Sequence, residues 1–164
     1  MSTLKVNNIA GVSGGTSPPI TLSGDTASVS IKGVIDGSNA SAGQVGEYLS
    51  TSVNAKAISS SASNMMSLSI TAGDWDLFAM CQFNGATAQY FNATLTTSSA
   101  THGSASDIGV SRFIIPVISA VGQGQGSIHL RANVTSTTTY YLVALTNAGS
   151  GDWFYGSLNA RRMR

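Results

Sequence analysis

Residues able to carry acid–base chemistry are few in this chain of 164 residues. Asp74 and Asp76 form a close carboxylate pair, and their i, i+2 spacing projects both from one side of a strand. Paired carboxylates hydrolyse glycosides, and with loop carbonyls they could also hold Ca²⁺. Because Glu47 is the sole glutamate and no second acidic cluster faces the pair in sequence, we expect a turn and surface role instead.

Nucleophilic catalysis needs a Ser, Thr or Cys beside an oriented base. The two histidines are His102, in a Gly/Ser loop, and His129, on the polar face of an expected strand. We expect His102 to be a solvated loop residue and His129 a sheet-surface or interface residue. The sequence thus predicts no enzymatic activity, no metal site and no cofactor.

Two glycine-containing motifs have a structural and a functional interpretation. Gly122–Gly126 reads GQGQG but lacks the Lys-Ser/Thr of a phosphate loop, so we interpret it as a flexible hairpin loop. Gly-Asp-Trp recurs at residues 73–75 and 151–153. In each motif we expect Gly to provide a permissive backbone, Asp to form an Asx turn, and the Trp ring to cover the end of the core. The alternative is a Trp that stacks on a sugar beside an acid.

Three arginines, Arg161, Arg162 and Arg164, lie in the last four residues. They could bind phosphate, pair with an acidic shell or line a threefold axis. The alternative is a solvated basic terminus. We retain Arg161 and Arg162 as candidate partner-binding residues.

Composition excludes several classes of function. Only 9% of residues are charged, the formal net charge is +1, and Ser and Thr number 26 and 16. Strong electrostatic attraction to nucleic acid or an anionic membrane is therefore not expected. We also expect no intramolecular disulfide, because Cys81 is the single cysteine, and no signal peptide or membrane insertion, because there is no apolar leader or run of 18 apolar residues.

Residues 43–164 show the alternation of an all-β domain. The segments with period-two patterning, bounded by Gly, Asn, Asp and Ser, are 46–53, 66–71, 75–83, 88–96, 110–121, 127–134, 138–146 and 152–162. About eight strands at this spacing predict a jelly-roll-like β-sandwich, without a helix of ten or more residues. The apolar 110–118 run exceeds what one small sandwich needs, so part of it should contact another subunit.

Residues 1–42 differ in composition and predict an extended N-terminal arm, punctuated by Gly14-Gly15, Pro18-Pro19 and Gly24-Asp25. Its apolar residues are too sparse to bury a core but are well placed to dock onto a partner. The candidate docking residues are Leu4, Val6, Ile9, Ile20 and Leu22.

The arm, with 2–9 reading STLKVNNI, resembles the virion-attachment arms of tailed-bacteriophage fibre and appendage proteins. The remainder is similar to small phage and prophage structural proteins in 42–48 (AGQVGEY), 69–76 (SITAGDWD), 137–144 (TTTYYLVA) and 160–164 (ARRMR). This resemblance implies a jelly roll that assembles as a homotrimer, with the arm gripping the particle.

A host-recognition fibre usually has a long shaft, whereas this chain passes from arm to domain near Gly43. An arm of about 40 residues could span about 130 Å at roughly 3.3 Å per residue, enough to cross neighbouring shell subunits. We therefore expect a capsid decoration (cement) protein on the virion exterior, made in the host cytoplasm and bound to the major capsid protein or another virion protein. The alternatives are a tail-fibre or tip adhesin, binding host surface glycan through residues such as Trp75, Tyr90, Trp153 and Tyr155, and a depolymerase.

Overall fold

The computed structural model of the protein describes residues 38–85, 90–103, 112–116, 122–147 and 151–164. Strands make up its regular structure, and this part of the chain contains no helix. The strands are β1 (Tyr48–Ile58), β2 (Ser63–Ile70), β3 (Gly73–Gly85), β4 (Tyr90–Thr96), β5 (Arg112–Pro116), β6 (Gly122–Val134), β7 (Thr138–Thr146) and β8 (Asp152–Arg162). The all-β prediction is confirmed. The predicted arm residues Leu4, Val6, Ile9, Ile20 and Leu22 lie outside the described residues.

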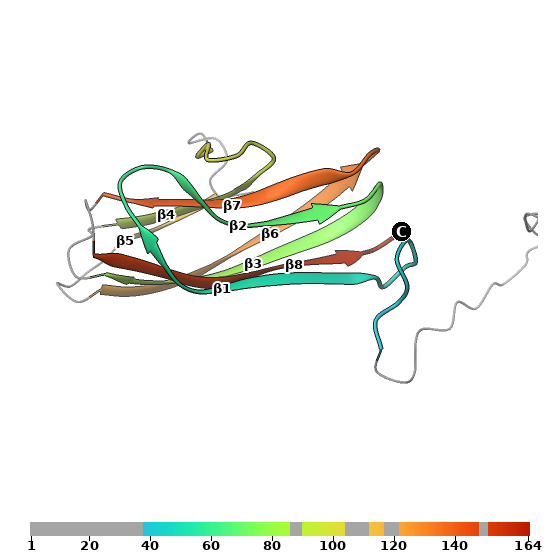
Figure 1. The fold of residues 1–164 in the computed structure, drawn as a ribbon, viewed down its shortest axis with the longest axis horizontal. Coiled ribbons are helices and arrows are strands. Elements are labelled where there is room, and N and C mark those ends of the chain that lie inside the picture. The colour runs from blue at the N-terminus through green and yellow to red at the C-terminus, as the bar shows by residue number, and fades with distance from the viewer. Residues whose placement is uncertain (1–37, 86–89, 104–111, 117–121, 148–150) are drawn as a thin grey trace, which may run out of the picture. The chain divides into compact units, whose positions relative to one another are not determined.

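The strands form two antiparallel four-stranded sheets that pack face to face as a β-sandwich (Figure 1). Sheet A has the order β1-β8-β3-β6 and sheet B the order β2-β7-β4-β5. Every connection except that from β4 to β5 passes from one sheet to the other. Residues distant in sequence therefore meet at the two ends of the sandwich.

The core lies between the sheets, because alternate residues of each strand point inward. On β3 the inward set is Trp75, Leu77, Ala79, Cys81 and Phe83, all nearly inaccessible to solvent. Phe83 stacks on Phe91 of β4 across the two sheets, with ring centroids 4.6 Å apart, and meets Phe154 of β8 edge-on at 5.2 Å. The Phe83–Phe91 contact joins the two sheets near one end of the sandwich, and the Phe83–Phe154 contact lies within sheet A.

The glycine-rich segment Gly122–Gly126 is not a hairpin loop, as the sequence suggested, but the first part of β6. It pairs residue by residue with Cys81–Gly85, and Gly124 lies directly opposite Phe83. Directly opposite residues of antiparallel strands share a face, so Gly124, opposite Phe83, and Gly126, opposite Cys81, occupy inward positions, and Gln123 and Gln125 point outward. The alternation is that of a strand.

The other strand predictions are confirmed in position, with differences at the boundaries. β7 and β8 have the predicted bounds, whereas β1 runs on to Ile58 beyond the expected end at Val53. A register shift between Val53 and Lys56, with Ala55 at a φ of 61°, breaks the alternation on which the prediction depended. β2 likewise begins earlier, at Ser63, across a shift between Asn64 and Met66. Of the predicted 110–121 strand, the structure describes Arg112–Pro116.

The two ends of the sandwich differ in what they carry. One end, which we call the terminal end, holds the segment 38–47, the turns at 71–72 and 135–137, and Met163–Arg164 (Figure 1). The opposite end holds the turn at 59–62 and Gly151–Asp152, where β8 begins. No helix in the described residues is long and apolar enough to span a membrane.

Candidate functional site

Charged side chains concentrate at the terminal end of the sandwich. Three of the four acidic residues in the described ranges lie there: Glu47, Asp74 and Asp76. The same end carries Arg131, Arg161, Arg162 and Arg164. Because the chain has so few charges, this clustering makes the terminal end the candidate functional site.

The buried centre of this cluster is the ion pair between Arg162 and Glu47. Nε of Arg162 donates to Oε2 of Glu47 at 2.9 Å, and the two side chains are 5% and 8% exposed. The guanidinium also donates to the carbonyl of Ala72 and to the hydroxyl of Thr71, and it lies 4.4 Å from the centroid of the Trp75 ring. Each of the three guanidinium nitrogens of Arg162 thus donates to an internal acceptor.

The same ion pair fixes the segment that leads into β1. Oε2 of Glu47 also accepts the backbone N–H of Gly43 at 2.8 Å. Backbone bonds join Gly46 N–H to the Arg162 carbonyl at 3.0 Å and Arg162 N–H to the Glu47 carbonyl at 2.9 Å. The segment that leads into β1 is therefore bonded to both the backbone and the side chain of Arg162.

Gly73 makes room for this arrangement. A Cβ at position 73 would lie 2.0 Å from Nη1 of Arg162, and its φ of +146° is one that residues with side chains rarely adopt. Gly151, in the matching Gly-Asp-Trp motif, also has a positive φ, but no atom lies within 4 Å of the Cβ it lacks. The permissive-backbone interpretation is confirmed at both glycines.

A second ionic group joins the end of the chain to β3. Asp74 accepts two bonds from Arg131, at 2.9 Å and 2.6 Å, and one from Arg164 at 2.9 Å. These two arginines hold the pKa of the Asp74 carboxyl well below its usual range. The backbone N–H of Met163 also donates to the Asp74 carbonyl at 2.8 Å. The end of the chain is therefore bound to the sandwich.

The acidic pair and one of the two histidines share the outer face of sheet A. Asp76 and Asp74 do point to the same outer face of sheet A, where Asp76 binds Nε2 of His129 at 2.6 Å. His129 is a sheet-surface residue, as expected. His102 is half-buried and bonded to the Thr94 hydroxyl at 3.1 Å, so its interpretation as a solvated loop residue was wrong. No metal-binding cluster of His, Cys, Asp and Glu occurs among the described residues.

The candidate partner-binding arginines have different environments. Arg162 is buried and paired with Glu47, so a solvated terminus is wrong for that residue, and its part in partner binding stays a prediction. Arg161, on the outer face of β8, is exposed and makes no ion pair with a described residue. Arg161 thus remains accessible to a ligand or partner.

The proposed glycan-binding aromatic residues do not form one group. Trp75 is buried at the terminal end and donates its indole N–H to the Thr71 carbonyl at 2.9 Å. Trp153 and Tyr90 are exposed but belong to different sheets, and Tyr155 is partly exposed on sheet A. The expectation that Trp75 covers the core end is confirmed. Trp153 points outward, and Phe154 fills the corresponding core position.

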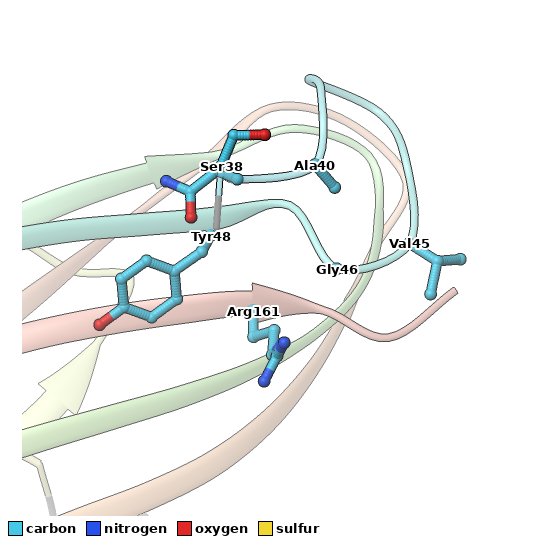
Figure 2. Close-up of a pocket in the computed structure, with 7 residues that line it drawn as sticks. Ser38, Ala40, Val45, Gly46, Tyr48 and Arg161 are labelled. Atoms are coloured by element: carbon cyan, nitrogen blue, oxygen red, sulfur yellow. The ribbon is translucent and has the colours of Figure 1, made fainter. Parts of the chain in front are cut away.

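A cavity of about 300 Å³ opens beside Arg161 at the terminal end. Its lining, which we call the Arg161 pocket, consists of Ser38, Asn39, Ala40, Val45, Gly46, Tyr48 and Arg161. Figure 2 shows Tyr48 on β1 and Arg161 on β8 side by side, with the segment carrying Ser38 and Ala40 passing next to them. Sequence reasoning missed this pocket because 38–48 folds back along a strand more than 110 residues later.

Comparison of the whole chain with known protein families, curated proteins and solved structures finds no match.

Proposed function

We propose that the protein is a non-enzymatic structural component of a tailed-phage virion, and specifically a trimeric capsid decoration protein. In this proposal the N-terminal arm clamps neighbouring capsid subunits and the sandwich lies on the shell exterior. The observation that carries the proposal is the anchorage of the segment 40–47, through Glu47 and Arg162, into the terminal end of the sandwich. In this proposal the arm would begin at a segment that is bonded to the sandwich.

We further propose that the sandwich is a jelly roll, an architecture found in viral capsid domains. The support is the pairing pattern, in which β1 pairs with β8, β2 with β7, β3 with β6, and β4 with β5. This is the pattern of one long antiparallel hairpin of eight strands that is wrapped into two sheets.

Apolar side chains on the outside of the sandwich support the trimer. Phe78 and Met80 are 39% and 47% exposed on the outer face of sheet A, where Phe78 contacts the His129 ring edge-on and Met80 lies between serine residues. Ile114, on the edge strand β5 and within the run predicted to meet another subunit, is 42% exposed. Subunit contacts would remove these side chains from water.

The proposed mechanism is thermodynamic linkage. A protein that binds only the assembled, expanded lattice adds its binding free energy to the stability of that lattice. No reactive group is required for this function.

Deletion of residues 1–25 tests the arm. It removes all five candidate docking residues and leaves the anchored segment 40–47 in place, so we expect loss of capsid binding with an unchanged unfolding transition. A full-length variant with Leu4, Val6, Ile9, Ile20 and Leu22 replaced by Ser controls for arm length and should behave in the same way. Retention of the truncated protein on purified capsids, measured by co-sedimentation, would contradict the proposal.

The alternative function, a tail-fibre or tip adhesin, is favoured by the exposure of Trp153 and Tyr90. Immunogold electron microscopy of intact particles separates the two. Label over the head supports decoration, label at the tail supports the adhesin, and an unlabelled particle contradicts both. Adsorption of the purified protein to host cells would be expected of the adhesin alone.

A further inference from the structure

We propose that the Arg161 pocket binds a carboxylate-bearing monosaccharide of the uronic acid class. This inference is independent of the protein's position on a particle. It rests on the pocket's size, its one accessible cation, its aromatic wall and its polar rim.

Within the described residues, Arg161 has no carboxylate partner because the carboxylates at this end of the sandwich bind other cations. Arg162 binds Glu47, and Arg131 and Arg164 both bind Asp74. Asp76, directly across the strand from Arg161, binds His129 instead. Arg161 therefore lines the pocket without a carboxylate partner among the described residues, and the planar donor pair of its guanidinium suits a carboxylate.

Tyr48 supplies a wall whose position is fixed. Its hydroxyl donates to Oδ1 of Asn159 at 2.7 Å, and the Ser50 hydroxyl donates to the same oxygen at 2.8 Å. With the hydroxyl held on β8, the 41%-exposed ring lines the cavity beside Arg161. An immobilised aromatic surface can cover the apolar face of a sugar ring with little further loss of side-chain entropy.

The remaining lining favours a sugar over other anions. Ser38 and Asn39 make part of the lining polar, whereas Ala40, Val45 and Gly46 add little bulk. A volume of about 300 Å³ is at the lower limit for ligand sites and suits a single ring. One arginine in the lining matches the single charge of a carboxylate better than the nearly double charge of a phosphate.

Titration of the ¹⁵N-labelled full-length protein with sodium glucuronate tests the assignment. We expect saturable chemical-shift changes at Gly46, Tyr48 and the Arg161 side chain, with a Kd of about 1 mM, typical of a few directional contacts. Glucose, which lacks the carboxylate, and acetate, which lacks the ring, should each bind at least 10-fold more weakly. Inorganic phosphate is the fourth probe and should also be weaker than glucuronate.

Three variants locate the site. Arg161→Gln should weaken glucuronate binding at least 10-fold, and Tyr48→Leu should weaken it several-fold. Arg164→Gln is the matched control, because it removes the same charge from the same end outside the pocket, and its affinity should equal that of the wild type. Glucose or phosphate binding as tightly as glucuronate, no saturable binding of glucuronate, or an unchanged affinity in Arg161→Gln would each overturn the proposal.

Discussion

Arg162 and Glu47 are 115 positions apart in the sequence, yet Nε of the arginine and Oε2 of the glutamate lie 2.9 Å apart in the folded protein. Both side chains are buried, and each also binds backbone at the terminal end of the sandwich. The ion pair therefore joins three segments: the entry to β1, the turn before β3 and the last residues of β8.

Removal of one partner of this pair should strongly destabilise the fold. Arg162→Met leaves the Glu47 carboxylate buried without its cation, which costs about 3–5 kcal/mol in comparable sites. We expect a decrease of that size in the free energy of unfolding, measured by urea titration. The double variant Glu47→Gln/Arg162→Met removes the stranded charge and should recover part of the loss. A double variant less stable than the single variant would contradict this explanation.

The two Gly-Asp-Trp motifs provide a matched comparison of backbone strain and steric conflict. Gly151→Ala introduces a side chain at a positive φ but into open space, so it should cost about 1–2 kcal/mol. Gly73→Ala combines an unfavourable φ with a Cβ 2.0 Å from the Arg162 guanidinium. We expect the larger loss of unfolding free energy at Gly73, and equal losses would show that the arginine yields without cost.

Much of the fold was predictable because alternation is a local signal. The bounds of β7 and β8 and the inward positions of Ile128 and Ala132 follow from the residues themselves. Gly122–Gly126 was misassigned because glycines usually indicate a loop, whereas the strand conformation of this segment depends on its pairing with Cys81–Gly85, earlier in the chain.

The candidate site was less predictable, because it depends on pairing between distant segments. A run of arginines at the end of a chain is usually solvated, so the run by itself does not predict a buried member. The alternation of β8 places Arg162 inward and Arg161 outward, but the carboxylate that pairs with Arg162 belongs to Glu47, just before β1. The register between β1 and β8 brings this carboxylate to Arg162.

Asp74 should make stability depend on pH under acid conditions. Arg131 and Arg164 lower its pKa in the folded state, so folding favours the ionised carboxylate. The resulting stabilisation is present above the unfolded-state pKa, about 3.9, and is lost as the pH falls toward the lower folded-state pKa. Unfolding free energies measured between pH 5 and pH 2 should therefore fall less steeply in Asp74→Asn than in the wild type. Arg161→Gln, which leaves Asp74 and both of its partners intact, should retain the wild-type slope.

Cys81 should be chemically inert in the folded protein. It is 2% exposed, and burial raises the pKa of its thiol to about 12, so almost no thiolate is present at pH 8. We expect no reaction with a colorimetric disulfide reagent in buffer and one equivalent of reaction in 8 M urea. Rapid modification without denaturant would show that β3 and β8 separate readily near this residue.

The adjacency of β1 and β8 has a mechanical consequence. Tension applied between residue 38 and residue 164 acts on neighbouring antiparallel strands at the same end, so it would peel their hydrogen bonds apart one after another. Tyr48 and Arg161 form the first residue pair between these strands, and the Glu47–Arg162 ion pair adjoins it at the terminal end, so both would be loaded first. Tension applied between residue 38 and the opposite end would instead load all the rungs of β1 together in shear. The domain should therefore resist tension along its length far better than tension that separates residue 38 from residue 164.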